Sequence, residues 1–320
     1  MGDLRGSPGG ALRGPLPERA RRRGGRARAG RRGRLSGEAK PPAGAGPPIA
    51  APSTTAASAA VNPVASSGFG RSARAYDRAR PGWPPAAVHA AFDHWSLAPQ
   101  AARVVDLAAG TGRLTRELLA AGASVTAIEP LDEMRALISG AETLPGTAES
   151  IPLSDAFADA VFVAEAFHWF DAPRALAEIA RVLRPGGGLA VLWNVGVTAD
   201  DEEPWRAEVV ELVRDVYYHP EGRRTPSASG NDPRDDPAAW RTGPGWELFE
   251  PLTLRSFEHT QRITAEDYVA LVSSWSFVGA LPDPDRTELL AGVAAVLAEH
   301  GVAAFDQRWR TDAYLTSLNS

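Results

Sequence analysis

Short apolar runs alternate with amphipathic segments between residues 103 and 195, and this alternation predicts repeated β–α units. Units of this kind build an α/β fold around a parallel sheet. The predicted strands are Arg103–Leu107, Ser124–Ile128, a short third strand before Gly146, Asp159–Ala164 and Leu189–Trp193.

Two amphipathic segments between these strands predict helices. Thr111–Ala120 is the first, with Gly122 as a natural end. Asp171 is predicted to cap the second, which Pro185-Gly186-Gly187-Gly188 would end. The residues predicted to face the sheet are Leu114, Leu118 and Leu119 in the first helix, and Leu176, Ile179, Val182 and Leu183 in the second.

Beyond Val195 the pattern is looser. The polar, Pro- and Gly-rich residues 219–245 are interpreted as a loop. Thr264 and Asp267 resemble a capping box that would open a helix running to Ser274. The other predicted elements are a helix over Trp205–Tyr217, a helix over Asp285–His300 stopped by Gly301, and a last strand over Gln307–Tyr314.

The first 60 residues differ from the rest in composition and charge. They hold 12 of the 34 Lys and Arg residues and 3 of the 39 Asp and Glu residues, which leaves 22 basic and 36 acidic residues in the remainder. With almost no large apolar side chains, residues 1–65 are predicted to be a disordered tail. Its alternative interpretations are a basic arm for RNA or anionic lipid, an organelle transit peptide, or upstream sequence translated from a misplaced start codon.

We expect one domain over residues 66–320, with a cofactor-binding half (66–195) and a substrate-side half (196–320). Its acidic charge argues against a nucleic-acid substrate and favours a small molecule. The absence of cysteine excludes disulfides, thiolate zinc sites and a cysteine nucleophile. The histidines show no ligand spacing, so no metal is assigned. No apolar run reaches about 18 residues, so no membrane span is expected and the predicted location is the cytoplasm.

The stretch Val104–Gly112 predicts the most specific site. It reads as a buried strand that ends in Asp106, followed by a small-residue turn and a helix. Gly110 and Gly112 would let backbone approach a ligand, and the helix beginning near Thr111 would offer free N–H groups to a carboxylate. Asp106 suits a cofactor that carries an ammonium group, whereas a pyrophosphate-binding turn has no use for a carboxylate. The turn therefore favours S-adenosylmethionine over NAD.

Two further segments follow neighbouring strands. Glu129, with Pro130 after it, closes the second strand, where an acid can bind both hydroxyls of a ribose. NAD sites place an acid there too, so Glu129 does not distinguish the two cofactors. In the segment Gly146–Glu149, the backbone of Ala148 could pair with an adenine edge, and Glu149 lies beside it.

The ordered set of motifs resembles the class I S-adenosylmethionine-dependent methyltransferases, in the small-molecule group that includes ubiquinone/menaquinone-type and trans-aconitate-type enzymes. The resemblance covers residues 69–195. Two residues depart from it, since Ala108 stands where many members have Gly, and Thr147 where many have Asp. The motifs that carry it are VVDLAAGTGRLTREL, VTAIEPLDEMR, GTAESIPL, FADAVFVAEAFHWFD and LAEIARVLRPGGGLAVLWN.

The resemblance implies a Rossmann-like, seven-stranded, mostly parallel sheet with helices on both faces and one antiparallel strand near the C-terminus. It also implies that Phe69–Arg80 covers the cofactor and that Pro81–Pro84 closes this lid. The implied cofactor-binding residues are Asp106, Ala108, Gly110, Thr111, Gly112, Glu129, Pro130, Ala148, Glu149 and Ala164, with Tyr76 and Arg80 near the methionine end.

His168 and Glu165 are the candidate catalytic residues, because both follow the fourth strand and would lie near the transferred methyl group. Methyl transfer from a sulfonium is an in-line displacement with an activated leaving group, so a base is needed only where the acceptor must lose a proton. His168 could instead be a structural histidine held by its neighbours, and Glu165 a structural carboxylate. Oxygen or carboxylate acceptors are favoured, and the oligomeric state is left open.

The sequence leaves three alternative functions. An NAD(P)-binding oxidoreductase would need a third turn glycine where Thr115 stands, and its Tyr-x-x-x-Lys pair is impossible because the single Lys, Lys40, lies in the tail. A non-catalytic module of the same fold would keep the turn and Glu129 without turnover. An RNA methyltransferase would depend on the Arg-rich tail.

Overall fold

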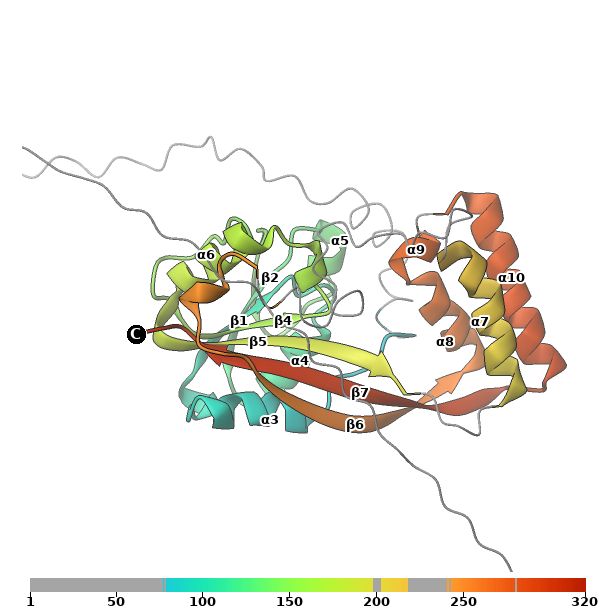
Figure 1. The fold of residues 1–320 in the computed structure, drawn as a ribbon, viewed down its shortest axis with the longest axis horizontal. Coiled ribbons are helices and arrows are strands. Elements are labelled where there is room, and N and C mark those ends of the chain that lie inside the picture. The colour runs from blue at the N-terminus through green and yellow to red at the C-terminus, as the bar shows by residue number, and fades with distance from the viewer. Residues whose placement is uncertain (1–76, 78, 198–202, 218–240, 242, 280) are drawn as a thin grey trace, which may run out of the picture. The chain divides into compact units, whose positions relative to one another are not determined.

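A seven-stranded sheet forms the centre of the molecule, in the order β3-β2-β1-β4-β5-β7-β6 (Figure 1). The computed structural model describes residues 77–320 apart from 78, 198–202, 218–240, 242 and 280, all in the unit Ala57–Ser320. The strands are β1 (Arg103–Leu107), β2 (Ser124–Ile128), β3 (Glu142–Leu144), β4 (Ala158–Ala164), β5 (Leu183–Gly196), β6 (Thr253–Thr264) and β7 (Ala304–Ser317). The predicted tail, Tyr76 and most of the predicted loop over 219–245 lie outside the described residues.

The strand directions confirm the predicted topology. β3, β2, β1, β4 and β5 pair in parallel, whereas β7 runs antiparallel to both β5 and β6. The chain passes from β1 to β2 on one side of β1 and later returns to β4 on its other side. The carboxyl ends of β1 and β4 therefore form a topological switch point, where open α/β sheets bind ligands.

Helices cover both faces of the sheet. On one face, α6 and a short 3-10 turn, η5, pack against alternate residues of β1, β4 and β5. On the other face, α3 and α4 pack against the intervening residues of the same strands. The elements on these faces and their connections are α3 (Pro85–His94), η2 (Pro99–Ala101), α4 (Arg113–Ala120), α5 (Asp132–Arg135), η3 (Phe167–Trp169), α6 (Ala172–Val182) and η5 (Trp246–Leu248).

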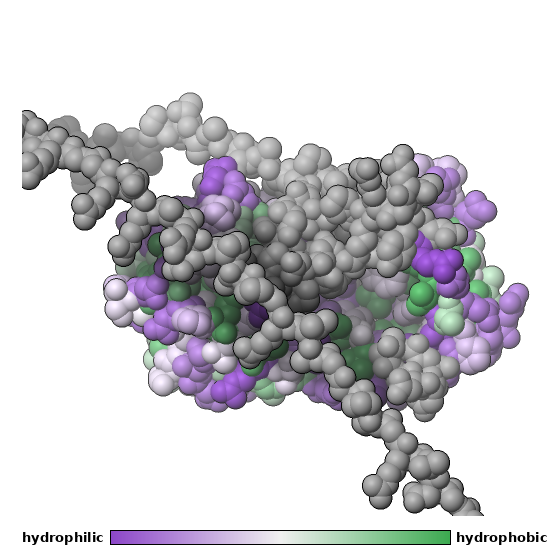
Figure 2. Space-filling model, viewed as in Figure 1, coloured by the Kyte–Doolittle hydropathy of each residue, from purple (hydrophilic) through white to green (hydrophobic). Residues whose placement is uncertain are grey.

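A second apolar core joins the helices of the C-terminal half. Trp205 on α7 is fully buried there and packs against Phe305 of β7, and Ile263 of β6 belongs to the same core. On the face shown in Figure 2, hydrophilic side chains cover most of the coloured rim. The helices are α7 (Pro204–Tyr217), α8 (Ala265–Ser273), α9 (Ser276–Gly279) and α10 (Asp283–Glu299).

Several predicted elements are confirmed closely. β1 and β2 have the predicted bounds, and α7 and α10 lie within two residues of theirs. The predicted capping box opens α8, because the Thr264 hydroxyl accepts a hydrogen bond from the Asp267 N–H at 3.1 Å.

Two predictions about α6 are wrong. The helix ends at Val182 rather than at the glycines, and residues 183–188 already belong to β5. The glycines permit this continuation, because Gly186 has a φ of +73° and a Cβ at Gly188 would lie 2.0 Å from the Trp95 ring. Asp171 occupies the N-cap position but its side chain makes no capping hydrogen bond. Pro173 in the first turn has no N–H, so one of the backbone donors from which a capping side chain could accept a hydrogen bond is missing.

The C-terminal strands differ most from the prediction. β7 spans Ala304–Ser317, longer at both ends than Gln307–Tyr314, and β6 was not predicted at all. β6 is the outermost strand and is exposed over most of its length. Its sequence therefore lacks the apolar run that identifies a buried strand.

Candidate functional site

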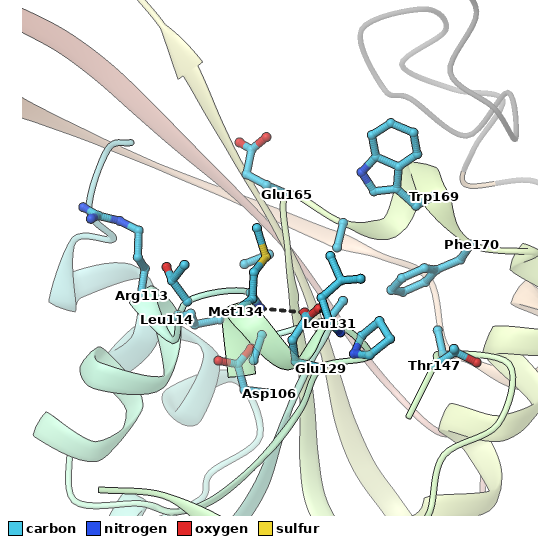
Figure 3. Close-up of a pocket in the computed structure, with 18 of the residues that line it drawn as sticks. Asp106, Arg113, Leu114, Glu129, Leu131, Met134, Thr147, Glu165, Trp169 and Phe170 are labelled. Carbon is cyan, nitrogen blue, oxygen red and sulfur yellow. Dashed lines mark hydrogen bonds between the residues drawn. The ribbon is translucent and has the colours of Figure 1, made fainter. Parts of the chain in front are cut away.

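A cavity of about 410 Å³ opens at the carboxyl ends of β1, β2, β4 and β5. In Figure 3, Asp106 and Glu129 rise from neighbouring strands, and Glu165 and Trp169 lie across the cavity from them. The cavity is lined by 26 residues, from the segment Arg80–Trp83, the ends of these strands and the loops after them, the segment 146–149 and the first residues of α4, α5 and α6. This position is the predicted one for a ligand site of an open α/β sheet.

The turn after β1 is built from left-handed backbone. Ala108, Gly110 and Gly112 have φ values of +57°, +58° and +80°. A Cβ added at Gly110 would meet no atom within 4 Å, so a side chain there would project into the cavity. Ala108 adopts this conformation with a Cβ, which is tolerated at a modest cost in strain. Gly112 does not line the cavity; it is the N-cap of α4, which begins at Arg113 rather than Thr111.

Asp106 presents a buried carboxylate to this cavity. Its side chain is 1% exposed, and Oδ2 accepts a 2.5 Å hydrogen bond from the Thr115 hydroxyl. Oδ1 has no hydrogen-bond partner among the described residues. Burial raises the pKa of Asp106 to about 7, with a further rise from the Glu129 charge, against the lowering effect of Thr115. A buried carboxylate oxygen without a donor is a place where a ligand ammonium would be stabilised.

Glu129 ties the ends of β1 and β2 together. Its Oε2 accepts from the Gly110 N–H and its Oε1 from the Leu131 N–H, both at 2.9 Å. Burial raises the pKa of Glu129, and these two backbone donors oppose the rise. The carboxylate therefore holds the glycine turn in place while it lines the cavity.

Hydrogen bonds hold the segment before α3 against the turn that follows β1 and the start of α4. The Asp77 carboxylate accepts from the Thr111 hydroxyl at 2.6 Å and from the Arg116 guanidinium at 2.8 Å. These bonds lower the pKa of Asp77, although partial burial opposes them. Arg113 donates to the carbonyl oxygens of Asp77 and Pro81.

The other end of this segment reaches the C-terminal half. Arg80, which lines the cavity, donates to the hydroxyl and carbonyl oxygens of Ser274 at 3.0 and 2.9 Å. The Gly82 carbonyl accepts from the Asn194 side chain at 3.2 Å. We call Asp77–Trp83, without residue 78, the covering segment.

The two candidate catalytic residues occupy different environments. Glu165 lines the cavity, and its Oε1 accepts from the Asn194 N–H at 2.6 Å. His168 is buried between the rings of Trp169 and Trp193, with centroid distances of 4.6 and 5.3 Å, and it does not line the cavity. Of the two, Glu165 is the one that a bound acceptor could reach.

The structure brings most of the predicted site residues to one cavity. Ala148 is buried in its wall, and the Glu149 carboxylate beside it accepts from the Asp171 N–H at 2.9 Å. Gly112 and His168 lie outside the lining, and Tyr76 is not among the described residues. The predicted residues that line the cavity are Arg80, Asp106, Ala108, Gly110, Thr111, Glu129, Pro130, Ala148, Glu149, Ala164 and Glu165.

Sequence reasoning missed Asn194, Arg113 and Arg174, all of which line the cavity. Asn194 carried a usable signal, because it is a polar residue directly after the apolar run 189–193, just as Asp106 and Glu129 follow apolar runs. Arg113 and Arg174 look like ordinary first-turn residues of helices, so nothing in the sequence marked them.

The part of the chain that the structure describes contains no group of three or more His, Asp or Glu side chains that could hold a metal ion. None of its helices is both long enough and apolar enough to cross a membrane.

Comparisons with known proteins agree with this geometry. Residues 105–191 match the family described as "Methyltransferase domain". An uncharacterized methyltransferase of Mycobacterium tuberculosis is 39% identical over 243 residues, which cover 74% of this chain and 88% of that protein. The malonyl-[acyl-carrier protein] O-methyltransferase of Methylococcus capsulatus is 36% identical over 122 residues, 35% of this chain and 44% of that protein.

A solved structure described as a type II methyltransferase from Anaeromyxobacter dehalogenans shares the fold. Its TM-score is 0.51 at 22% identity, over 75% of this chain and 97% of that one. The fold and the site together define a methyltransferase. The chain belongs to the class I S-adenosylmethionine-dependent methyltransferases, which favours the sulfonium cofactor over the nicotinamide alternative considered from the sequence.

Proposed function

We propose that this enzyme binds S-adenosylmethionine in the cavity and transfers its methyl group to an oxygen atom of a small molecule. The observation that carries the cofactor site is Asp106 Oδ1, a buried oxygen without a donor among the described residues, beside a glycine turn open to the cavity. When bound, the cofactor supplies a methyl group on a sulfonium, which is already an activated leaving group.

The residues of the chain fit distinct parts of the cofactor. Asp106 would hold the ammonium group, and Glu129 the ribose hydroxyls. The backbone of Ala148 would contact the adenine edge, while Arg80 on the covering segment would lie near the methionine carboxylate. The covering segment would also exclude water, because it is fastened to the turn through Asp77 and to β5 through Asn194.

Glu165 would act on the methyl acceptor as a general base. Its carboxylate lines the cavity and is held by the Asn194 N–H, so it can take the proton of a hydroxyl acceptor as the oxygen attacks the methyl carbon in line. A carboxylate acceptor has no proton to lose at neutral pH, so it would need no base, and Glu165 could hydrogen-bond to it only in the protonated form. The malonyl-[acyl-carrier protein] O-methyltransferase similarity and the acidic charge of residues 61–320 support an oxygen acceptor over a nucleic acid.

Calorimetric titration with S-adenosylhomocysteine tests the cofactor site. We expect micromolar binding by the full chain and at least tenfold weaker binding by Asp106→Ala and Glu129→Ala, because each removes a charged hydrogen-bonding group. Well-folded protein that binds nothing would overturn the proposal.

Mass spectrometry of small-molecule acceptors tests the second part. Matched compounds that carry a hydroxyl, a carboxylate or an amine would be incubated with the enzyme and S-adenosylmethionine. Methylation confined to the amines would contradict the oxygen acceptor and leave the cofactor site intact.

A further inference from the structure

Asn194 connects three parts of the site through three different groups. Its backbone N–H donates to Glu165 Oε1, and its side-chain Nδ2 donates to the Gly82 carbonyl of the covering segment. Its Oδ1 accepts a 2.5 Å hydrogen bond from the Thr311 hydroxyl and lies 3.4 Å from His259 Nε2. Asn194 itself lines the cavity, whereas Thr311 and His259 do not.

The hydrogen bonds fix the orientation of the Asn194 amide. The Thr311 hydroxyl has one hydrogen and gives it to Asn194 Oδ1, so the 3.2 Å contact between Thr311 Oγ1 and His259 Nε2 requires a hydrogen on the histidine. The Gly82 carbonyl can only accept a hydrogen bond, so the reversed amide, which would point its oxygen at Gly82, is excluded. In the orientation that points Nδ2 at the covering segment, the Thr311 hydroxyl supplies the donor for Oδ1.

Thr311 is placed for this role by the sheet. It lies opposite Asn194 in the β5–β7 register and is fully buried. Thr311 is 117 residues from Asn194 along the chain, and Asn194 is 112 residues from Gly82. The C-terminal strand thus supports a contact made by the segment that covers the cofactor site.

We propose that Asn194, oriented by Thr311, is a positioning residue: its hydrogen bond to the Gly82 carbonyl holds the covering segment over the cofactor. This inference rests on the cofactor site proposed above. Without the Thr311 hydroxyl, Asn194 Oδ1 loses its 2.5 Å donor, the amide is held less firmly, the Gly82 contact weakens, and bound cofactor dissociates more readily. Thr311 acts only through Asn194, because its own side chain does not reach the cavity.

The test compares three buried-threonine variants of the full chain by titration with S-adenosylhomocysteine. Thr311→Val keeps the shape and removes the hydroxyl, and we expect its dissociation constant to rise about fivefold, the value of one net hydrogen bond. Thr311→Ser restores the donor and should bind as the wild type does. Thr316→Val is the matched control, because Thr316 lies on the same strand, is 1% exposed and donates to the Glu250 carbonyl, away from the cavity.

Comparing the two Val variants separates an effect on cofactor binding from a general loss of stability. Thr311→Val and Thr316→Val should lower the melting temperature to a similar extent, whereas only Thr311→Val should weaken binding. Equal binding by Thr311→Val and the wild type would overturn the proposal. If Thr311→Val does not fold, Asn194→Ala replaces it, with a rise of about fivefold or more expected and unchanged affinity as the contrary result. Failure of the wild type itself to bind would reject the cofactor site and this inference together.

Discussion

The two walls of the cavity are built in different ways. The cofactor wall, which comprises Asp106–Gly112 and Glu129, is assembled from one short stretch of chain by backbone geometry and buried acids. The covering wall, which comprises the covering segment, Glu165 and Asn194, is held by side-chain hydrogen bonds between residues up to 194 positions apart. A wall built from one short stretch of chain can be predicted from the sequence, whereas a wall built from long-range contacts cannot.

The difference also separates binding from chemistry. Burial raises the pKa of both acids of the cofactor wall, so a cationic ligand group that prefers the ionised form would couple its binding to their deprotonation. Glu165 on the covering wall lines the same cavity and lies across it from these two acids (Figure 3). Substitutions on the first wall should change affinity, and Glu165 on the second should govern turnover.

The largest effect is expected from Glu165→Gln. With a hydroxyl acceptor we expect kcat to fall about 100-fold or more, because the amide cannot accept the proton, while the affinity for S-adenosylhomocysteine changes little. His168→Gln, the matched control, should change kcat less than about threefold, because His168 does not line the cavity. Single-turnover rates of both variants measure this, and the reverse order of effects would assign the chemistry to His168.

Asp106→Asn should weaken S-adenosylhomocysteine binding by about 10- to 100-fold at pH 8, because a charged hydrogen bond to the ammonium is lost. In the wild type the ionised form binds, so affinity should rise by about tenfold per pH unit below pH 7 and level off above the Asp106 pKa of about 7. Calorimetry between pH 5.5 and 8.5 measures both, and a wild-type affinity independent of pH would contradict the role of Asp106.

The same substitution should have the opposite effect on the unliganded protein. Burial raises the pKa of Asp106 above its ordinary value of 3.8, so the folded state binds more protons than the unfolded state between pH 3.8 and about 7. This contribution to stability is present at low pH and is lost as the pH rises through that window. At pH 8 the melting temperature of unliganded Asp106→Asn should therefore exceed that of the wild type.

The smallest effect is expected from Asp77→Asn, which weakens the fastening of the covering segment. We expect the dissociation constant for S-adenosylhomocysteine to rise about fivefold, because the bonds to Thr111 and Arg116 lose their charge while the turn itself is unchanged. Asp306→Asn is the control, since it breaks an exposed ion pair with Arg262 on the C-terminal strands. Equal affinities for the two variants would show that the covering segment holds without Asp77.

The fold and the cofactor wall could be predicted because their signals are local. Asp106 and Glu129 each lie at the carboxyl end of an apolar run, and the glycines between them mark a turn in left-handed backbone. Asn194 carried the same strand-end signal, but its partners Gly82 and Thr311 are more than 100 residues away in the chain. His168 lies outside the cavity lining although Glu165 of the same motif lies within it, because a motif places residues near a site without showing which way each side chain points.

Gly188 and Trp95 illustrate a constraint that neither residue shows alone. The indole lies against β5 where a Cβ at position 188 would stand 2.0 Å from the ring, and its N–H donates to the Thr316 carbonyl at 2.9 Å. Any side chain at 188 would force the Trp95 ring to move, and a small side chain at 95 would remove the contacts that the partly buried ring makes with β5. Substitutions at the two positions are therefore coupled. A residue larger than Gly at 188 requires that Trp95 be replaced by a smaller residue first or at the same time.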